Sequence, residues 1–141
     1  MNIKDVMTAN PVLVKPSTSV KDAAAQMARE GIGFILAGAD DELKGTLTDR
    51  DIVLRAVANG KDVDNTTVAD ILTDDLLYCF EDQDVEEVAR NMGEKQVRRL
   101  PVVNAQKRLV GVVSLGDLAK HLRPETAGKV LGDISMKFTA H

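Results

Sequence analysis

The stretch Asp5-Val6-Met7-Thr8 returns as Asp70-Ile71-Leu72-Thr73, an offset of 65 residues in a chain of 141. The apolar positions that follow keep this offset, since Val20, Ala24 and Met27 correspond to Val85, Ala89 and Met92. One residue is added around Arg98-Arg99, after which the offset is 66 and Gly45, Thr48 and Asp51 correspond to Gly111, Ser114 and Asp117. A match that covers residues 3–57 and 68–122 indicates one supersecondary unit built twice.

Local signals predict the same first elements in both copies. Short apolar runs at 11–14 and 76–80 predict buried strands. Apolar residues at helical spacing, with the methionines as core residues, predict a helix after each strand. Gly31 predicts a C-cap for the first helix, whereas Gln96 at the corresponding place predicts a different ending for the second. Two N-terminal capping boxes are expected, at Ser19 with Asp22 and at Asp84 with Glu87.

The second half of each copy predicts a hairpin and a last helix. Strands beginning at 34–36 and 100–103 lead through polar turns into further strands, which end at Thr48 and Ser114. The last helices are expected from about Asp51 to Val57 and from about Asp117 to Leu122. The unit is therefore strand, helix, strand, strand, helix.

The predicted fold class is α/β, or more strictly α+β, with two β-α-β-β-α repeats. Because units of this size are only marginally stable alone, we expect the repeats to pack through their sheets about a pseudo-twofold axis and leave two clefts. Residues 1–60 form the first repeat, 61–67 a linker and 68–123 the second repeat. Residues 124–141 are a C-terminal extension, expected as a short helix with a loose tail.

The composition restricts location and partners. A net charge of -4 and a pI of about 5.2 argue against a nucleic-acid or anionic-membrane surface. No apolar run is long enough to span a bilayer. Cys79 is the single cysteine and lies in an apolar run, which indicates a buried small hydrophobe in a reduced compartment. We therefore expect a cytoplasmic protein.

One motif recurs at the end of each hairpin. Residues 45–51 and 111–117 share the pattern Gly-x-x-(Thr/Ser)-x-x-Asp. A hydroxyl three residues before a carboxylate is a capping box, which stabilises many helices that bind nothing. The same box placed twice after a strand can instead hold a phosphate on backbone N–H groups, while the carboxylate accepts the hydroxyls of a ribose. Both interpretations stay open.

With Leu100-Pro101-Val102-Val103, these two motifs resemble a tandem pair of cystathionine-β-synthase (CBS) domains, and the resemblance spans nearly the whole chain. Pairs of this family typically form a disc, often as a homodimer. They bind AMP, ATP, ADP, NAD or S-adenosylmethionine in the clefts and regulate an attached or separate protein, as in energy sensing. The resemblance implies that the aspartate holds the ribose and that the hydroxyl lies near the phosphate.

Carried over by residue, the resemblance implies two unequal clefts. Arg98 and Arg99 of the second repeat are expected to reach the first cleft, whereas the corresponding stretch of the first repeat, Ile32-Gly33-Phe34, offers the second cleft no arginine. A charge-assisted contact contributes about 1.5–3 kcal/mol, so we expect phosphate to bind more tightly in the first cleft. Asp74 and Asp75 lie near that cleft and would repel a polyphosphate. They therefore favour a monophosphate, with AMP as the expected ligand, or a cationic ligand such as S-adenosylmethionine. The first cleft is expected to use Thr48, Arg50, Asp51, Leu77, Tyr78, Arg98 and Arg99, and the second Ser114, Asp117, Pro11 and Val12.

No catalytic or metal-binding set is expected. His121 and His141 form no recognisable triad or metal site with Cys79. The leading hypothesis is a regulatory module that binds an adenine nucleotide and signals through its conformation or association to an unidentified partner. The alternative is a ligand-free dimerising scaffold in which Thr48 and Ser114 serve only as caps, and a small nucleotide hydrolase comes third.

Overall fold

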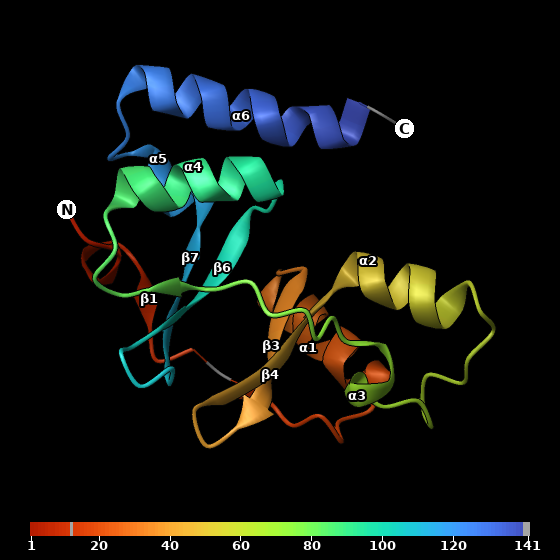
Figure 1. The fold of residues 1–141 in the computed structure, drawn as a ribbon. Helices are drawn as coiled ribbons and strands as arrows, with labels where there is room; N and C mark the ends of the chain where they lie inside the picture. The colour runs from red at the N-terminus through yellow and green to blue at the C-terminus, as the bar shows by residue number, and fades with distance from the viewer. Residues whose placement is uncertain (12, 140–141) are drawn as a thin grey trace. The chain divides into compact units, whose positions relative to one another are not determined.

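The structure is a computed structural model that describes residues 1–11 and 13–139 (Figure 1). The chain forms two compact units. One holds Val12–Leu76 and is called the repeat-one unit below. The other holds Leu77–His141 together with Met1–Pro11 and is called the repeat-two unit. The first eleven residues thus belong to the unit built mainly from the second repeat.

The repeat-one unit contains a three-stranded sheet in the order β2-β3-β4. Strand β2 is parallel to β3, which forms an antiparallel hairpin with β4. Asp40 and Asp41 at the tip adopt positive φ, as a tight hairpin turn requires. The elements are β2 (Leu13–Val14), α1 (Val20–Glu30), β3 (Phe34–Ala39), β4 (Glu42–Thr48), α2 (Asp49–Asp51), the π-helical η2 (Ile52–Val57) and α3 (Val68–Ile71).

The repeat-two unit contains a four-stranded sheet in the order β1-β7-β6-β5. Strand β5 is parallel to β6, and β7 is antiparallel to both β6 and β1. The predicted order strand, helix, strand, strand, helix is confirmed in both units. The elements are η1 (Ile3–Asp5), β1 (Thr8–Ala9), β5 (Cys79–Phe80), α4 (Val85–Lys95), β6 (Arg99–Val103), β7 (Leu109–Ser114), α5 (Leu115–Ala119) and α6 (Pro124–Thr139).

The opening segments of the two repeats are exchanged between the units. In the repeat-two unit, the Ile3 N–H donates to Gln83 O over 3.0 Å. In the repeat-one unit, Val68, which corresponds to Ile3, donates to Thr18 O over 2.8 Å. Further along, β1 pairs with β7, while Thr73 exchanges backbone hydrogen bonds of 2.9 and 3.0 Å with Thr46 of β4. Each opening segment therefore pairs with the last strand of the other repeat's hairpin, as a strand in the repeat-two unit and as an isolated bridge in the repeat-one unit.

A glycine in the last strand of each hairpin admits the exchanged segment. A Cβ on Gly45 would lie 2.6 Å from both Leu72 Cδ1 and Thr73 O. A Cβ on Gly111 would lie 2.5 Å from Met7 Sδ and 2.9 Å from Thr8 O. Since real side chains do not approach so closely, both positions require glycine for close backbone packing.

Each unit has its own aliphatic core. The predicted core positions of Met27 and Met92 are confirmed, because both side chains are buried. Cys79 is also buried, as expected, in the core of the repeat-two unit. The exchanged segments contribute directly, with Ile3 in the core of the repeat-two unit and Ile71 in that of the repeat-one unit.

Several expected helix ends are corrected by the structure. Gln96 does not end α4 differently, since it adopts the left-handed conformation with φ of 56°, as Gly31 does with φ of 64°. The last helices begin at Asp49 and Leu115 rather than two residues later, because the preceding hydroxyl residues are the N-caps. The boxes expected at Ser19 and Asp84 are one-sided caps, and the strands expected at 11–14 and 76–80 are shorter.

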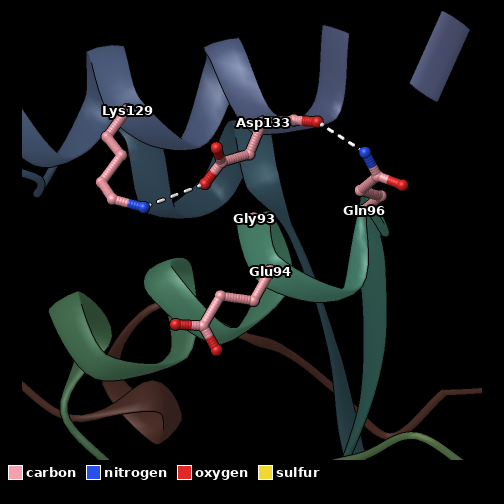
Figure 2. A pocket seen from close by; sticks show the side chains of 5 residues that line it. All are labelled: Gly93, Glu94, Gln96, Lys129 and Asp133. Carbon is pink, nitrogen blue, oxygen red and sulfur yellow. Dashed lines mark hydrogen bonds and ion pairs between the residues drawn. The ribbon is translucent and has the colours of Figure 1, made fainter. Parts of the chain in front are cut away.

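The C-terminal extension forms α6, which lies along α4 (Figure 1). Val130 and Ile134 of α6 are buried in the core of the repeat-two unit. Gly93 of α4 lets the helices approach, since a Cβ there would lie 3.3 Å from Val130 Cα. The side chain of Gln96 donates to Asp133 O over 3.0 Å (Figure 2). The extension forms a helix as expected, but with 16 residues it is longer than the short helix predicted, and Ala140 and His141, the end of the expected tail, lie outside the described residues.

Candidate functional site

The first motif forms a reciprocal cap where β4 ends. The Asp51 N–H donates to Thr48 Oγ1 over 3.0 Å, and the Thr48 N–H donates to Asp51 Oδ2 over 2.9 Å. The other oxygen, Asp51 Oδ1, lies 3.8 Å from Arg55 Nε. These contacts fix the carboxylate at the junction of strand and helix, with both side chains half-buried.

The second motif repeats this geometry where β7 ends. The Asp117 N–H donates to Ser114 Oγ over 3.0 Å, and the Ser114 N–H donates to Asp117 Oδ2 over 2.9 Å. The capping interpretation is thus confirmed at both motifs. Capping and ligand binding are compatible, because a carboxylate oxygen has two lone pairs and the hydroxyl keeps a donor.

The two motifs differ at the helix N-terminus. In the repeat-one unit the first three helical N–H groups have protein acceptors: Gly33 O for Asp49 at 3.0 Å, Asp49 Oδ1 for Arg50 at 2.8 Å, and the Thr48 hydroxyl for Asp51. The Asp49 carboxylate therefore occupies the place where a helix N-terminus favours an anion. Leu115 takes the corresponding position in the repeat-two unit, without an acid. Sequence reasoning missed this role of Asp49.

The two arginines lie beside the second motif. Arg99 is the cross-strand partner of Ser114, and the Leu115 N–H donates to Arg98 O over 2.8 Å. Directly opposed residues on neighbouring strands place their side chains on the same face of a sheet. The structure therefore places Arg99 beside Ser114 in the repeat-two unit, to which Arg98 and Asp117 also belong, whereas Thr48, Arg50 and Asp51 belong to the repeat-one unit.

Leu77 and Tyr78 also belong to the repeat-two unit. They directly precede β5, which is parallel to β6, so they enter the sheet from the end at which Arg99 lies. Both side chains are partly exposed, and the ring of Tyr78 makes an edge contact with Phe80 at a centroid distance of 5.7 Å. The arginines, the cap and an accessible aromatic ring thus occupy one end of one sheet.

Pro11 lies at the other end of that sheet. The preceding Asn10 N–H donates to Val110 O over 3.3 Å. Ser114 is four residues further along β7, a separation of about 13 Å at the usual rise of a strand. The structure therefore does not bring Pro11 to Ser114, and Val12 lies outside the described residues.

Four further features of the described residues concern metal binding, thiol reactivity, membrane insertion and a pocket. Residues 1–11 and 13–139 contain no group of three or more His, Cys, Asp or Glu side chains arranged to hold a metal ion. Burial raises the pKa of the Cys79 thiol to about 12, which makes it a poor nucleophile. No helix among these residues has the length and apolar character needed to cross a bilayer. A pocket between α4 and α6, shown in Figure 2, is lined by none of the expected site residues.

Comparison with known sequences agrees with the duplicated unit. The sequence model of the CBS domain family matches residues 3–57 and 68–124. The CBS domain-containing protein YhcV of Bacillus subtilis is 38% identical over 135 residues, 95% of this chain and 95% of that protein. An inosine-5'-monophosphate dehydrogenase of Methanocaldococcus jannaschii is 33% identical, but the matched region is only 23% of that enzyme.

Solved structures show the same fold. Hypoxic Response Protein I with two coordinated zinc ions has a TM-score of 0.78 at 36% identity, over 86% of this chain and 99% of that one. CBSX2 in complex with AMP has a TM-score of 0.72 at 28% identity, over 84% and 93%. The CBS domain pair of MJ0100 in complex with 5-methylthioadenosine and S-adenosyl-L-methionine has a TM-score of 0.73 at 26% identity, over 85% and 94%.

Fold and motifs together define a tandem-repeat α+β protein in which each repeat ends its hairpin with a hydroxyl–carboxylate cap. The chain belongs to the CBS domain family.

Proposed function

We propose that this protein is a regulatory module that binds an adenine nucleotide, AMP in the first place, and catalyses no reaction itself. The observation that carries the proposal is the reciprocal cap, formed twice with matching geometry at the ends of β4 and β7. Related pairs in complex with AMP and with S-adenosyl-L-methionine support the class of ligand. A monophosphate would report on the energy state of the cell.

The surroundings of the two caps favour the repeat-two unit for the phosphate. Arg99 lies opposite Ser114 on the neighbouring strand and directly follows Arg98, while the Asp49 carboxylate stands at the helix N-terminus beside Thr48. Charge-assisted hydrogen bonds are shorter and stronger than neutral ones, and a carboxylate next to a phosphate opposes binding. We therefore assign the tighter phosphate contact to the Ser114 cap, which reverses the order expected from the sequence.

Signalling then follows from differential binding. A ligand can shift an equilibrium between two arrangements only by as much as its affinities for them differ. We propose that the nucleotide favours an arrangement in which residues of both repeats reach it, and that a homodimer of the chain passes this change to a separate regulated protein in the cytoplasm.

A thermal-shift panel of AMP, ATP, NAD and S-adenosylmethionine tests the proposal. A ligand present at about 100 times its dissociation constant stabilises the native state by about 2.7 kcal/mol. We expect AMP to raise the melting temperature of the wild type and to lose most of that effect with Asp117→Asn. Asp70→Asn is a matched control, because Asp70 forms a similar box with Thr67, with its Oδ2 2.9 Å from Thr67 N, outside the proposed site.

The competing function is a scaffold without ligand. Both caps are complete within the protein, so Thr48 and Ser114 have a structural role that needs no nucleotide. A panel in which no ligand shifts the wild-type melting temperature would favour this scaffold. A shift that Asp70→Asn removes as fully as Asp117→Asn would show that loss of stability, and not loss of the site, accounts for the effect.

A further inference from the structure

The guanidinium of Arg55 joins the first cap to the opening segment of the second repeat, residues 67–73. Its Nε lies 3.8 Å from Asp51 Oδ1, the carboxylate oxygen that the cap does not use. Its Nη1 donates to Ile71 O over 3.0 Å and to Leu72 O over 3.3 Å. These contacts are called the Arg55 bridge below, and they all lie within the repeat-one unit.

The two carbonyls of the Arg55 bridge lie at the C-terminal end of α3. Ile71 is the last residue of that helix and Leu72 is its C-cap. The last carbonyls of a helix have no partner within the helix, and an arginine side chain is one of the groups that can donate to them. Because Ile71 is also buried in the core of the repeat-one unit, the bridge connects the cap to a segment that is anchored in the core.

The bridge ends directly beside the backbone pair that holds the opening segment to the sheet. Thr73 follows Leu72 and exchanges hydrogen bonds of 2.9 and 3.0 Å with Thr46 of β4. From Thr73 the chain continues through residues 74–76 into the repeat-two unit. The Asp51 carboxylate is therefore only one side chain away from the segment that leads into the other unit.

The second repeat lacks this bridge. Asp117 corresponds to Asp51, but His121 stands at the position of Arg55. Among the described residues, the side chain of His121 has no hydrogen-bond or ion-pair partner. The helices differ in the same sense, because α5 ends before this position, whereas η2 carries Arg55. The two caps thus have matching geometry but different connections to the opening segments.

The helix that carries Arg55 also has an unusual form. Residues 52–57 are π-helical, and the Ala58 N–H donates to Val53 O over 2.9 Å. Helical turns of this kind are rare and occur frequently at functional sites. The corresponding helix of the second repeat, α5, is α-helical. In the described part of the chain, the π-helical segment and the bridge therefore occur together in one repeat only.

We propose that Arg55 is a positioning residue that couples the Asp51 carboxylate to the opening segment of the second repeat. The inference rests on the proposed function, in which Asp51 accepts hydroxyls of the ribose. A carboxylate oxygen has two lone pairs, so Asp51 Oδ1 can accept a ribose hydroxyl and keep Arg55. Binding then restricts the carboxylate, which restricts the guanidinium that holds the two carbonyls. Nucleotide at the first cap stabilises the opening segment in this way, whereas the second cap has no such bridge.

Amide hydrogen exchange of the full chain without nucleotide tests the coupling. The amides of Leu72 and Thr73 report on the opening segment, because each donates a backbone hydrogen bond of 2.9 Å. In Asp51→Asn the new side chain can still accept in the cap, but its amide group donates and so breaks the contact with Arg55. Since 48% of the Arg55 side chain is exposed, the guanidinium can then turn to water. We expect both amides to exchange roughly threefold to tenfold faster.

A double variant separates this coupling from a general loss of stability. In an Arg55→Gln background, Asp51→Asn should change the exchange rates by roughly twofold or less, because the bridge is already lost. Arg55→Lys should behave like Arg55→Gln, since an ammonium lacks the planar fork that reaches a carboxylate and two carbonyls together. Asp117→Asn is the matched control. Met7, which corresponds to Leu72, should exchange in that variant as in the wild type.

Saturating AMP tests the step that involves the ligand. We expect AMP to slow exchange at Leu72 and Thr73 in the wild type and in His121→Gln, and to leave it unchanged in Arg55→Gln. AMP that binds without slowing these amides, or that slows them equally in Arg55→Gln, would overturn the inference and leave the proposed function intact.

The experiment without nucleotide keeps the two proposals distinguishable. An effect of Asp51→Asn that is equally large in the wild-type and Arg55→Gln backgrounds would overturn the inference whatever AMP does. Absence of AMP binding by the wild type would contradict the proposed function, while the exchange rates of the ligand-free variants would still decide whether Arg55 couples Asp51 to the opening segment.

Discussion

Gly45→Ala perturbs the exchange of opening segments with a single added carbon. That carbon would lie 2.6 Å from Thr73 O, a backbone atom that accepts the Thr46 N–H over 3.0 Å. The strand must move, which strains or breaks this pair of hydrogen bonds. Overpacking in a filled interior costs about 1–3 kcal/mol. At roughly 4 °C per kcal/mol for a chain of this size, the melting temperature should fall by several degrees.

Urea unfolding of Gly45→Ala and the wild type measures this cost directly. Gly128→Ala is a matched control, because Gly128 lies in α6 with nothing within 4 Å of an added Cβ. Its alanine should stabilise the helix by up to about 1 kcal/mol. A Gly45→Ala variant within about 0.5 kcal/mol of the wild type, the usual range for a neutral surface change, would refute the close packing of the exchanged segment.

Two further predictions concern single ionisable groups. Cys79, with a pKa raised to about 12, should stay unmodified by a thiol reagent at pH 8 while the chain is folded and react fully once it is unfolded; rapid modification of the native protein would contradict its burial. Hydrogen bonds from the Thr126 hydroxyl and the Arg123 N–H hold the pKa of the Glu86 carboxyl below its usual range. A carboxyl whose pKa is lower in the folded than in the unfolded chain stabilises the native state at pH values above its unfolded-state pKa of about 4.3. This stabilisation is lost as the pH falls through the folded-state pKa. The difference in unfolding free energy between wild type and Glu86→Gln should therefore be largest near neutral pH and vanish in acid, and a difference independent of pH would show that the carboxylate charge does not hold α6.

The repeated elements were predictable because their signals are local. The pair Thr48 and Asp51 predicts a helix N-cap, and the apolar spacing around Met27 predicts a helix, each from residues that are close in the sequence. Gln96 was misjudged because the left-handed conformation, which glycine adopts freely, is open to other residues when the surrounding contacts compensate its cost. Here the Gln96 side chain gains a hydrogen bond to Asp133 O.

The exchange of opening segments could not be read from local pattern. Ile3 is buried in the core of the repeat-two unit, whose other buried residues are more than 70 positions away in the sequence. No local pattern in residues 1–11 indicates that they pack against this distant segment. The one available signal was the pair Gly45 and Gly111, since a glycine inside a strand marks close backbone approach. The family resemblance assigned Arg98 and Arg99 of the second repeat to the first cleft, and the pairing of Arg99 with Ser114 across β6 and β7 adds a neighbour that the sequence pattern did not reveal.

Isothermal titration calorimetry of AMP into the wild-type chain measures nucleotide binding most directly. We expect saturable binding that is lost with Asp117→Asn and kept with Asp70→Asn, since only the former carboxylate belongs to the cap proposed to bind the nucleotide. An absence of saturable binding by the wild type at concentrations up to roughly 1 mM, the limit that corresponds to a binding free energy of about −4.1 kcal/mol, would contradict the proposed function.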